Sequence, residues 1–245
     1  MYNDKTLEKL KYIVEILGAI IALLSSAFLI LVFIATSSAT STDNKTPEEA
    51  FYLSQINDIL YTPFTSTWEF DESQDLQTPE LPTGCEATAA STLLRMHGIV
   101  ATKFDVADAM PKSSTGEFVD AFWGDPYTPY GWACMAPCIG TTLKQFLDES
   151  QYEVVVSNGK SITNLTYPCQ IWVTMYMEDV QWTSYQEDGY KLPYNPHCII
   201  IISIDGQDNS VHCVDPLVGE LDYSLDLVES LYDQLGQQAV WINKL

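Results

Sequence analysis

The sequence has few basic residues and an excess of acidic ones. Lysine and arginine together number 11, against 33 aspartates and glutamates, which gives a formal net charge of −22. A surface with this charge repels phosphate backbones, so we expect no nucleic acid partner. Charged residues make up only 18% of the chain, whereas 47% of it is hydrophobic. Most of the chain is therefore expected to fold, with the acidic excess serving solubility.

The sequence also lacks internal repeats and a set of residues spaced for zinc binding. Only Cys134 and Cys138 have a comparable spacing, whereas a structural zinc site needs four convergent ligands. We therefore expect neither a metal nor an organic cofactor. The five cysteines other than Cys85 fit the role of small hydrophobic core residues. Cys134 and Cys138 could instead form a disulfide in an oxidising compartment.

One long uncharged run lies near the N-terminus, at residues 16–36. About 20 apolar residues are enough to span a hydrocarbon core as a helix. Three lysines precede the run and one follows it closely, so residues 1–15 are expected to form a cytoplasmic tail. A cleaved signal peptide is the alternative, but its apolar region is usually shorter, about 7–15 residues. The pattern favours a retained signal anchor, which is one transmembrane helix.

The rest of the chain reads as a linker and one domain. Residues 37–49 are small and polar, which is typical of a flexible linker. Residues 50–245 have the mixed pattern of a globular domain. With the tail in the cytoplasm, this domain is expected on the extracellular side of the cell membrane.

A cysteine stands at the expected start of a helix, in the stretch ELPTGCEATAAS. Thr83 and Glu86 fit a capping box, apolar residues then recur at helical spacing, and Gly98 can end the helix. A helix over residues 84–97 places Cys85 in the first turn, where the helix dipole favours a solvent-facing thiolate. The Cys85 amide could also donate to an oxyanion. A buried cysteine without chemistry fits the same local pattern.

Only three histidines could supply the base that such a cysteine needs. His97 lies at the far end of the same helix, about 18 Å from Cys85 along the axis, and is expected to be a helix-end residue. His197 opens a predicted buried strand, residues 198–204, which turns and returns over residues 211–214. The predicted hairpin therefore decides between His197 and His212.

Alternation along the strands selects one histidine and one carboxylate. Successive side chains point to opposite faces, so His212 points away from the face that Asp215 shares. Asp215 reaches the open end of the hairpin, where His197 begins the other strand. A carboxylate at that position can fix the tautomer of a histidine and stabilise its imidazolium. A strand-end histidine beside a turn aspartate is the alternative. If His197 and Asp215 face the same side, Cys198 and Cys213 should face opposite sides of the hairpin.

Together these stretches resemble the C39-like cysteine peptidases, papain-like enzymes related to domains that process bacteriocin leader peptides. The resemblance is carried by ELPTGCEATAASTLL, PHCIIIISIDG and VDPLVGE, and spans about residue 70 to the C-terminus. It implies that Cys85 is the nucleophile, His197 the base and Asp215 the residue that orients the base. It also implies that Gln77, shortly before the cysteine, contributes to the oxyanion hole.

The resemblance implies an α+β, papain-like fold in which the helix carrying Cys85 packs on an antiparallel sheet. Together with the anchor, it predicts a membrane-anchored, extracellular cysteine peptidase that acts on a peptide or protein substrate. The best-known relatives act in the cytoplasm, attached to exporters, so leader cleavage coupled to export is not implied. Hydrolysis of other amides, such as cell-wall peptides, acyl transfer and a non-catalytic binding module remain alternatives.

A long segment rich in glycine, proline and aromatic residues occupies residues 111–140. Long irregular segments are often functional, so its tryptophans could line a peptide groove. They fit a cover over the core equally well.

Overall fold

The structure is a computed structural model and describes residues 68–245. The expected tail, anchor and linker, residues 1–49, lie outside the described residues, as does the start of the expected domain. Within the described part of the chain, no helix is long and apolar enough to cross a membrane.

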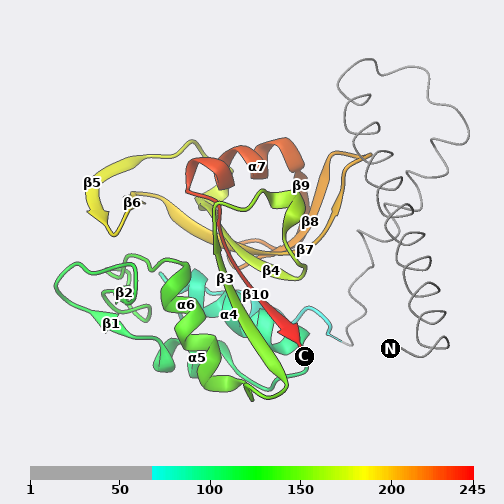
Figure 1. Ribbon diagram of the computed structural model, residues 1–245. Coiled ribbons are helices and arrows are strands. Elements are labelled where there is room, and N and C mark those ends of the chain that lie inside the picture. Colours follow the sequence, from blue (N-terminus) through cyan, green and yellow to red (C-terminus); the bar gives the residue numbers. More distant parts are fainter. Residues whose placement is uncertain (1–67) are drawn as a thin grey trace, which may run out of the picture. The chain divides into compact units, whose positions relative to one another are not determined.

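The core of the fold is a six-stranded sheet in which every neighbouring pair is antiparallel (Figure 1). Its spatial order is β3-β10-β4-β7-β8-β9. The bounds of these strands are Tyr152–Asn158 for β3, Cys169–Thr174 for β4, Pro196–Asp205 for β7, Ser210–Asp215 for β8, Gly219–Ser224 for β9 and Gln238–Lys244 for β10. The central strand β4 is buried at all of its positions, which requires cover on both faces of the sheet.

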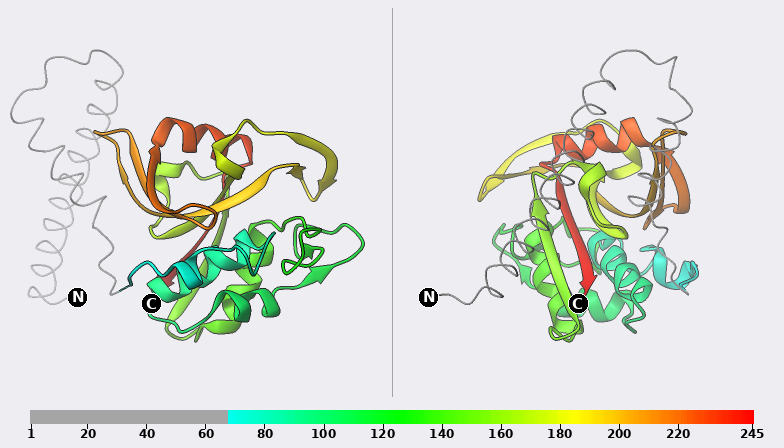
Figure 2. Two further views of the ribbon diagram at one scale, coloured as in Figure 1. Left: turned by 180° about the vertical axis from the view of Figure 1, so that it is seen from behind. Right: turned by 45° about the vertical axis from the view of Figure 1, so that its right-hand side comes forward.

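Helices supply that cover, in two separate layers (Figures 1 and 2). The α-helices are α3 (Glu72–Asp75), α4 (Cys85–Met96), α5 (Lys103–Ala109), α6 (Ala136–Leu143) and α7 (Leu225–Gln234). Helices α4 and α6 pack on one face and α7 packs on the other. Alternate residues of β7 therefore enter different cores, with Cys198 in the core beneath α4 and Ile199 in the core beneath α7. The observed α+β architecture is the expected one.

Smaller elements complete the fold. The two-stranded sheets are β1 (Lys112–Ser113) with β2 (Phe122–Trp123), which is parallel, and β5 (Trp182–Glu187) with β6 (Tyr190–Pro193), which is antiparallel. Three short 3-10 helices span Lys144–Phe146, Ile162–Asn164 and Met175–Met177. The Glu187 carboxylate at the end of β5 accepts hydrogen bonds from the backbone amides of Phe118 and Val119. These bonds tie the β5–β6 hairpin to the segment between β1 and β2.

Helix α4 begins and ends close to the expected positions, but its expected capping box is wrong. Gly84 is the N-cap, and no side chain caps the helix. The Thr83 hydroxyl instead donates to the Thr128 carbonyl, and the Glu86 carboxylate turns into the interior. Tertiary partners therefore displaced the local hydrogen bonds that the pattern predicts. At the other end Gly98 has φ +76, which is the left-handed conformation expected after the helix.

The predicted hairpin is formed by β7 and β8, with the turn between Asp205 and Ser210. Cys198 packs beneath α4, whereas Cys213 packs in the core on the other face, as alternation predicts. All six cysteines of the chain lie among the described residues, and all are free thiols in the interior. The alternative pairing of Cys134 with Cys138 is therefore not present in this structure.

Candidate functional site

Cys85 is the first residue of α4 and lines a small cavity at that end of the helix. Its side chain is only 5% exposed, so the expectation of a solvent-facing cysteine is wrong. The helix begins inside the domain, where α4 packs against β7. The cavity has a volume of about 180 Å³ and is also lined by Gln77 and His197. Three of the four predicted site residues therefore meet at one cavity.

Asp215, the fourth predicted residue, lies behind His197 at the end of β8. Its Oδ1 is 2.7 Å from His197 Nε2 and also accepts the Leu217 amide at 2.8 Å. Its Oδ2 accepts a hydrogen bond from the Tyr223 hydroxyl at 2.9 Å. Burial opposes the charged form, but these bonds and the neighbouring imidazole hold the pKa of Asp215 below its ordinary value. A buried carboxylate is thereby fixed against the histidine ring.

His197 lies between Asp215 and Cys85. Its Nε2 is engaged by Asp215, and its side chain lines the same cavity as the Cys85 thiol and acts on the pKa of that thiol. Nδ1 is therefore the ring nitrogen left for the cysteine. Burial lowers the pKa of His197, but the hydrogen bonds with Asp215 and Cys85 outweigh burial and raise that pKa to about 10. The ring is consequently held as an imidazolium at neutral pH.

The thiol of Cys85 differs from the thiolate expected at a helix N-terminus. Its pKa lies well above the ordinary value, first because of a hydrogen bond with Cys198 and then because of burial and the negative charge of Glu86. The hydrogen bond with His197 acts in the opposite direction. The buried neighbours of Cys85 therefore favour its neutral thiol, because they outweigh the helix dipole.

Gln77, the residue predicted to contribute to the oxyanion hole, lines the same cavity as His197. Its Nε2 donates one hydrogen bond to the Pro82 carbonyl at 3.0 Å, which leaves the second N–H of the amide for another acceptor. Its backbone N–H donates to the Pro216 carbonyl at 2.8 Å. This bond ties the segment before α4 to the turn after Asp215.

Aromatic side chains form one wall of the same cavity. Trp132 and Tyr194 line it together with Met175. The Trp132 ring stacks on Trp123 with centroids 4.8 Å apart and lies 6.0 Å from the Tyr194 ring. Tyr194 is 62% exposed, so this wall is open to molecules in solution. The irregular segment thus divides between the two expected roles, since Trp132 lines the site and Phe122 is core.

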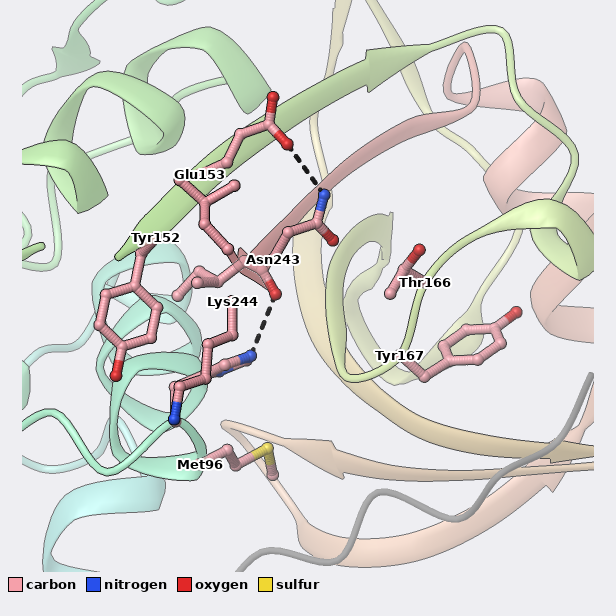
Figure 3. A pocket seen from close by; sticks show the side chains of 10 residues that line it. Met96, Tyr152, Glu153, Thr166, Tyr167, Asn243 and Lys244 are labelled. Carbon is pink, nitrogen blue, oxygen red and sulfur yellow. Dashed lines mark hydrogen bonds between the residues drawn. The ribbon is translucent and has the colours of Figure 1, made fainter. Parts of the chain in front are cut away.

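A larger hollow of about 690 Å³ lies elsewhere on the domain (Figure 3). It is lined by residues of the β3 and β10 ends, including Tyr152, Glu153 and Asn243. The Asn243 side chain on β10 donates a hydrogen bond at 3.1 Å to Glu153, its paired residue on β3. None of the four predicted site residues reaches this hollow.

One protein-family model covers most of the chain. The model described as the Peptidase_C39 like family matches residues 60–240. The chain belongs to the Peptidase_C39 like family. The matched range contains the cavity and all four predicted site residues, which supports a cysteine peptidase activity for this domain.

Solved structures similar to this C39-like domain include a candidate C39-like peptidase from Bacillus anthracis. It has 24% sequence identity and a TM-score of 0.62, and the match covers 73% of this chain and 98% of the other. A double glycine motif protease from an AMS/PCAT transporter, solved with its leader peptide, has 11% identity and a TM-score of 0.44. That match covers 72% of this chain and 93% of the other. The first match shows a shared fold. No curated protein is significantly similar in sequence.

Three residues at the C39-like site were not predicted from the sequence to act there. Cys198 contacts the Cys85 thiol, Tyr223 supports Asp215, and Glu86 contacts both Cys85 and the segment before α6. A signal for Glu86 existed, since it directly follows the cysteine, but helical spacing assigned it to a cap. Cys198 and Tyr223 reach the site through strand pairing, which no local pattern records.

Proposed function

We propose that this C39-like domain hydrolyses peptide bonds with Cys85 as the nucleophile, His197 as the acid and base, and Asp215 as the residue that orients His197. One observation carries the proposal, namely that an imidazole hydrogen-bonded to a buried carboxylate lines the same small cavity as a cysteine at a helix start. An orienting carboxylate, an imidazole and a nucleophile in that sequence are the parts of a catalytic triad.

The chemistry follows from these positions. The Cys85 sulfur, after releasing its proton to solvent, attacks the carbonyl carbon of the substrate and forms a tetrahedral intermediate. The imidazolium of His197 donates its proton to the leaving amine, and a thioester remains on Cys85. The neutral imidazole then takes a proton from water, which attacks the thioester and releases the carboxylic acid. The proton on His197 is restored in this second half of the reaction.

The oxyanion of each tetrahedral intermediate needs donors on the cavity side of Cys85. The Cys85 amide stands in the first turn of α4, where backbone N–H groups have no partner within the helix. The side-chain amide of Gln77 lines the same cavity. Both donors are assigned to the oxyanion hole because of these positions. Removal of one oxyanion donor typically lowers kcat by about 10²–10³-fold.

The substrate in this proposal is a peptide or protein segment that approaches along the aromatic wall. Trp132 and Tyr194 offer flat apolar surfaces beside the nucleophile, and aromatic contacts of this kind supply binding area with little conformational entropy cost.

The domain is proposed to stand outside the cell, held by residues 16–36 as a membrane anchor. That placement is supported by the uncharged run and the lysines before it.

The first test is peptide hydrolysis by the full-length protein, with a peptide library and mass spectrometry of the products. Cys85→Ala is expected to abolish cleavage, whereas Cys169→Ala is expected to leave it intact. Cys169 is a matched control because it is also fully buried but lies in the core on the other face of the sheet. Both variants are checked by circular dichroism and thermal unfolding.

Cleavage by Cys85→Ala at the wild-type rate would contradict the proposal. Binding of library peptides without any cleavage by the wild-type protein would indicate a non-catalytic binding module. The proposed location is tested separately by protease treatment of intact cells, which should digest the domain if it lies outside. Protection of the domain until the cells are lysed would overturn the extracellular placement.

A further inference from the structure

The carboxylate of Glu86 lies in the interior directly beside the nucleophile. Its side chain is 1% exposed. The Cys85 thiol donates a hydrogen bond to its Oε2 at 3.2 Å, and the Cys134 amide donates to its Oε1 at 3.0 Å. The Cys134 contact fixes the carboxyl group in place, because it joins α4 to the segment that precedes α6. The mechanism described above gives this buried acid no role.

The groups around Glu86 come from three elements. From α4 comes the Cys85 thiol, and from the segment before α6 come the amide and thiol of Cys134. From β7 come the imidazole of His197 and the thiol of Cys198. His197 is the only cation in this set, and it is already paired with Asp215. An ionised Glu86 is therefore a second negative charge at a site with one compensating positive charge.

The charge state of Glu86 sets which partner donates in its hydrogen bond with Cys85. As a carboxylate, Oε2 can only accept, so it holds the sulfur as a protonated donor and repels a thiolate. As a neutral carboxyl group, it can donate the same hydrogen bond to a thiolate. Burial raises the pKa of Glu86 from its ordinary value to about 7, so both states are accessible near neutral pH.

We propose that Glu86 is a positioning residue that controls whether Cys85 can ionise, favouring the thiolate when its own carboxyl group is neutral and the thiol when it is ionised. The effect on hydrolysis rests on the proposed function, whereas the effect on the ionisation of Cys85 does not. Only a proton moves in this step. The sulfur loses its proton to solvent, while the proton of the neutral Glu86 carboxyl group stays in the hydrogen bond to sulfur. Activity is therefore expected to decline as pH rises through about 7 and Glu86 ionises.

The test measures alkylation of Cys85 by iodoacetamide between pH 5 and 10, using the full-length protein and mass spectrometry of the modified peptide. The variant is Glu86→Gln, which keeps an oxygen for the Cys134 amide and an N–H for the sulfur but carries no charge. At pH 8 it is expected to alkylate about tenfold faster than wild type, since one pKa unit corresponds to a factor of ten. At pH 5 the two rates should be nearly equal.

The matched control is Glu149→Gln, the same change at an exposed residue on the turn before β3. It is expected to reproduce the wild-type alkylation profile. Glu86→Asp provides a second variant, which keeps the charge but shortens the side chain, and it should retain a dependence on pH that Glu86→Gln loses. Unfolding curves accompany all three variants, so that a loss of structure is recognised independently.

Identical pH profiles for wild type and folded Glu86→Gln would overturn the proposal, as would slower alkylation of Glu86→Gln at pH 8. The readout requires no substrate, so it separates this inference from the proposed hydrolysis. A shifted alkylation profile without peptide cleavage would retain the role of Glu86 and overturn only the peptidase. Peptide cleavage with unshifted profiles would do the reverse.

Discussion

At the residue scale, the site depends on which neighbours surround each buried ionisable group. Asp215 is stabilised as an anion by a histidine, a tyrosine hydroxyl and a backbone amide, so its pKa is lowered despite burial. Glu86 has hydrogen bonds but no cation of its own, so burial dominates and its pKa rises to about 7. Two buried carboxyl groups beside one histidine therefore have opposite tendencies.

Asp215→Asn is expected to lower peptide hydrolysis by roughly 10²–10⁴-fold and to change its pH dependence. Asp215 helps to raise the pKa of His197 to about 10, so its loss should lower the pH at which the His197 ring loses its proton. The measurement is the hydrolysis rate against pH, with the His197 ring followed by NMR. Asp222→Asn is the matched control, because Asp222 also contacts a histidine, His212, but on the exposed surface.

A His197 titration that stays in place in Asp215→Asn would show that Asp215 does not set the charge of His197. An equal loss of activity in both variants would point to general destabilisation instead.

At the scale of elements, the start of α4 decides where the nucleophile lies. Gly84 allows the segment before the helix to approach closely, since a Cβ at this position would lie 2.7 Å from Leu81 Cβ. The same segment carries Gln77, whose amide bonds to the turn after Asp215. The helix start, Gln77 and the end of β8 are thereby held together.

Gly84→Ala is expected to displace the first turn of α4 and reduce hydrolysis, with a loss of stability of about 1–3 kcal/mol from overpacking. The control is Gly206→Ala in the β7–β8 turn, where an added Cβ meets no atom within 4 Å. Urea unfolding gives the free energy of unfolding, and Cys85 alkylation reports the displacement. If Gly84→Ala matches the control in both measurements, the close approach does not position Cys85.

At the scale of the whole molecule, the large acidic excess opposes the stability of the fold near neutral pH. The formal net charge of −22 favours solubility but opposes compaction through self-repulsion. A buried Glu86 adds a specific cost, because the unfolded chain ionises this group at its ordinary pKa of 4.5 whereas the folded domain does so at about 7. Its contribution to stability is therefore present below pH 4.5 and is lost as pH rises through about 7.

Glu86→Gln is consequently expected to be more stable than wild type at pH 8, by on the order of 3 kcal/mol relative to their difference at pH 4.5. Urea unfolding of both proteins at several pH values measures this difference, and the titration of other groups cancels between them. A constant difference between pH 4.5 and pH 8 would mean that the carboxyl group of Glu86 titrates normally in the folded domain.

The sequence by itself determined the local elements and the residues that belong at their ends. Helical spacing with Gly98 located α4, and strand alternation separated His197 and Asp215 from His212, because both are periodic properties of a single segment. The resemblance of short motifs to a family was also readable and agrees with the family match. The roles of Cys85, His197, Asp215 and Gln77 remain predictions until variants are measured.

Only the tertiary structure decided the chemical environment of those residues. The capping box at Thr83 and Glu86 fails because Glu86 bonds to Cys134, a residue 48 positions away. The expected thiolate fails because Cys198, brought in by β7, and the buried Glu86 both favour the neutral thiol of Cys85. Helix dipoles and caps act within one turn, whereas burial and opposing charges arise from segments that meet only after folding. For this reason the sequence predicted the position of Cys85 at a helix start, whereas the burial and the neighbours that raise the pKa of its thiol come from the fold.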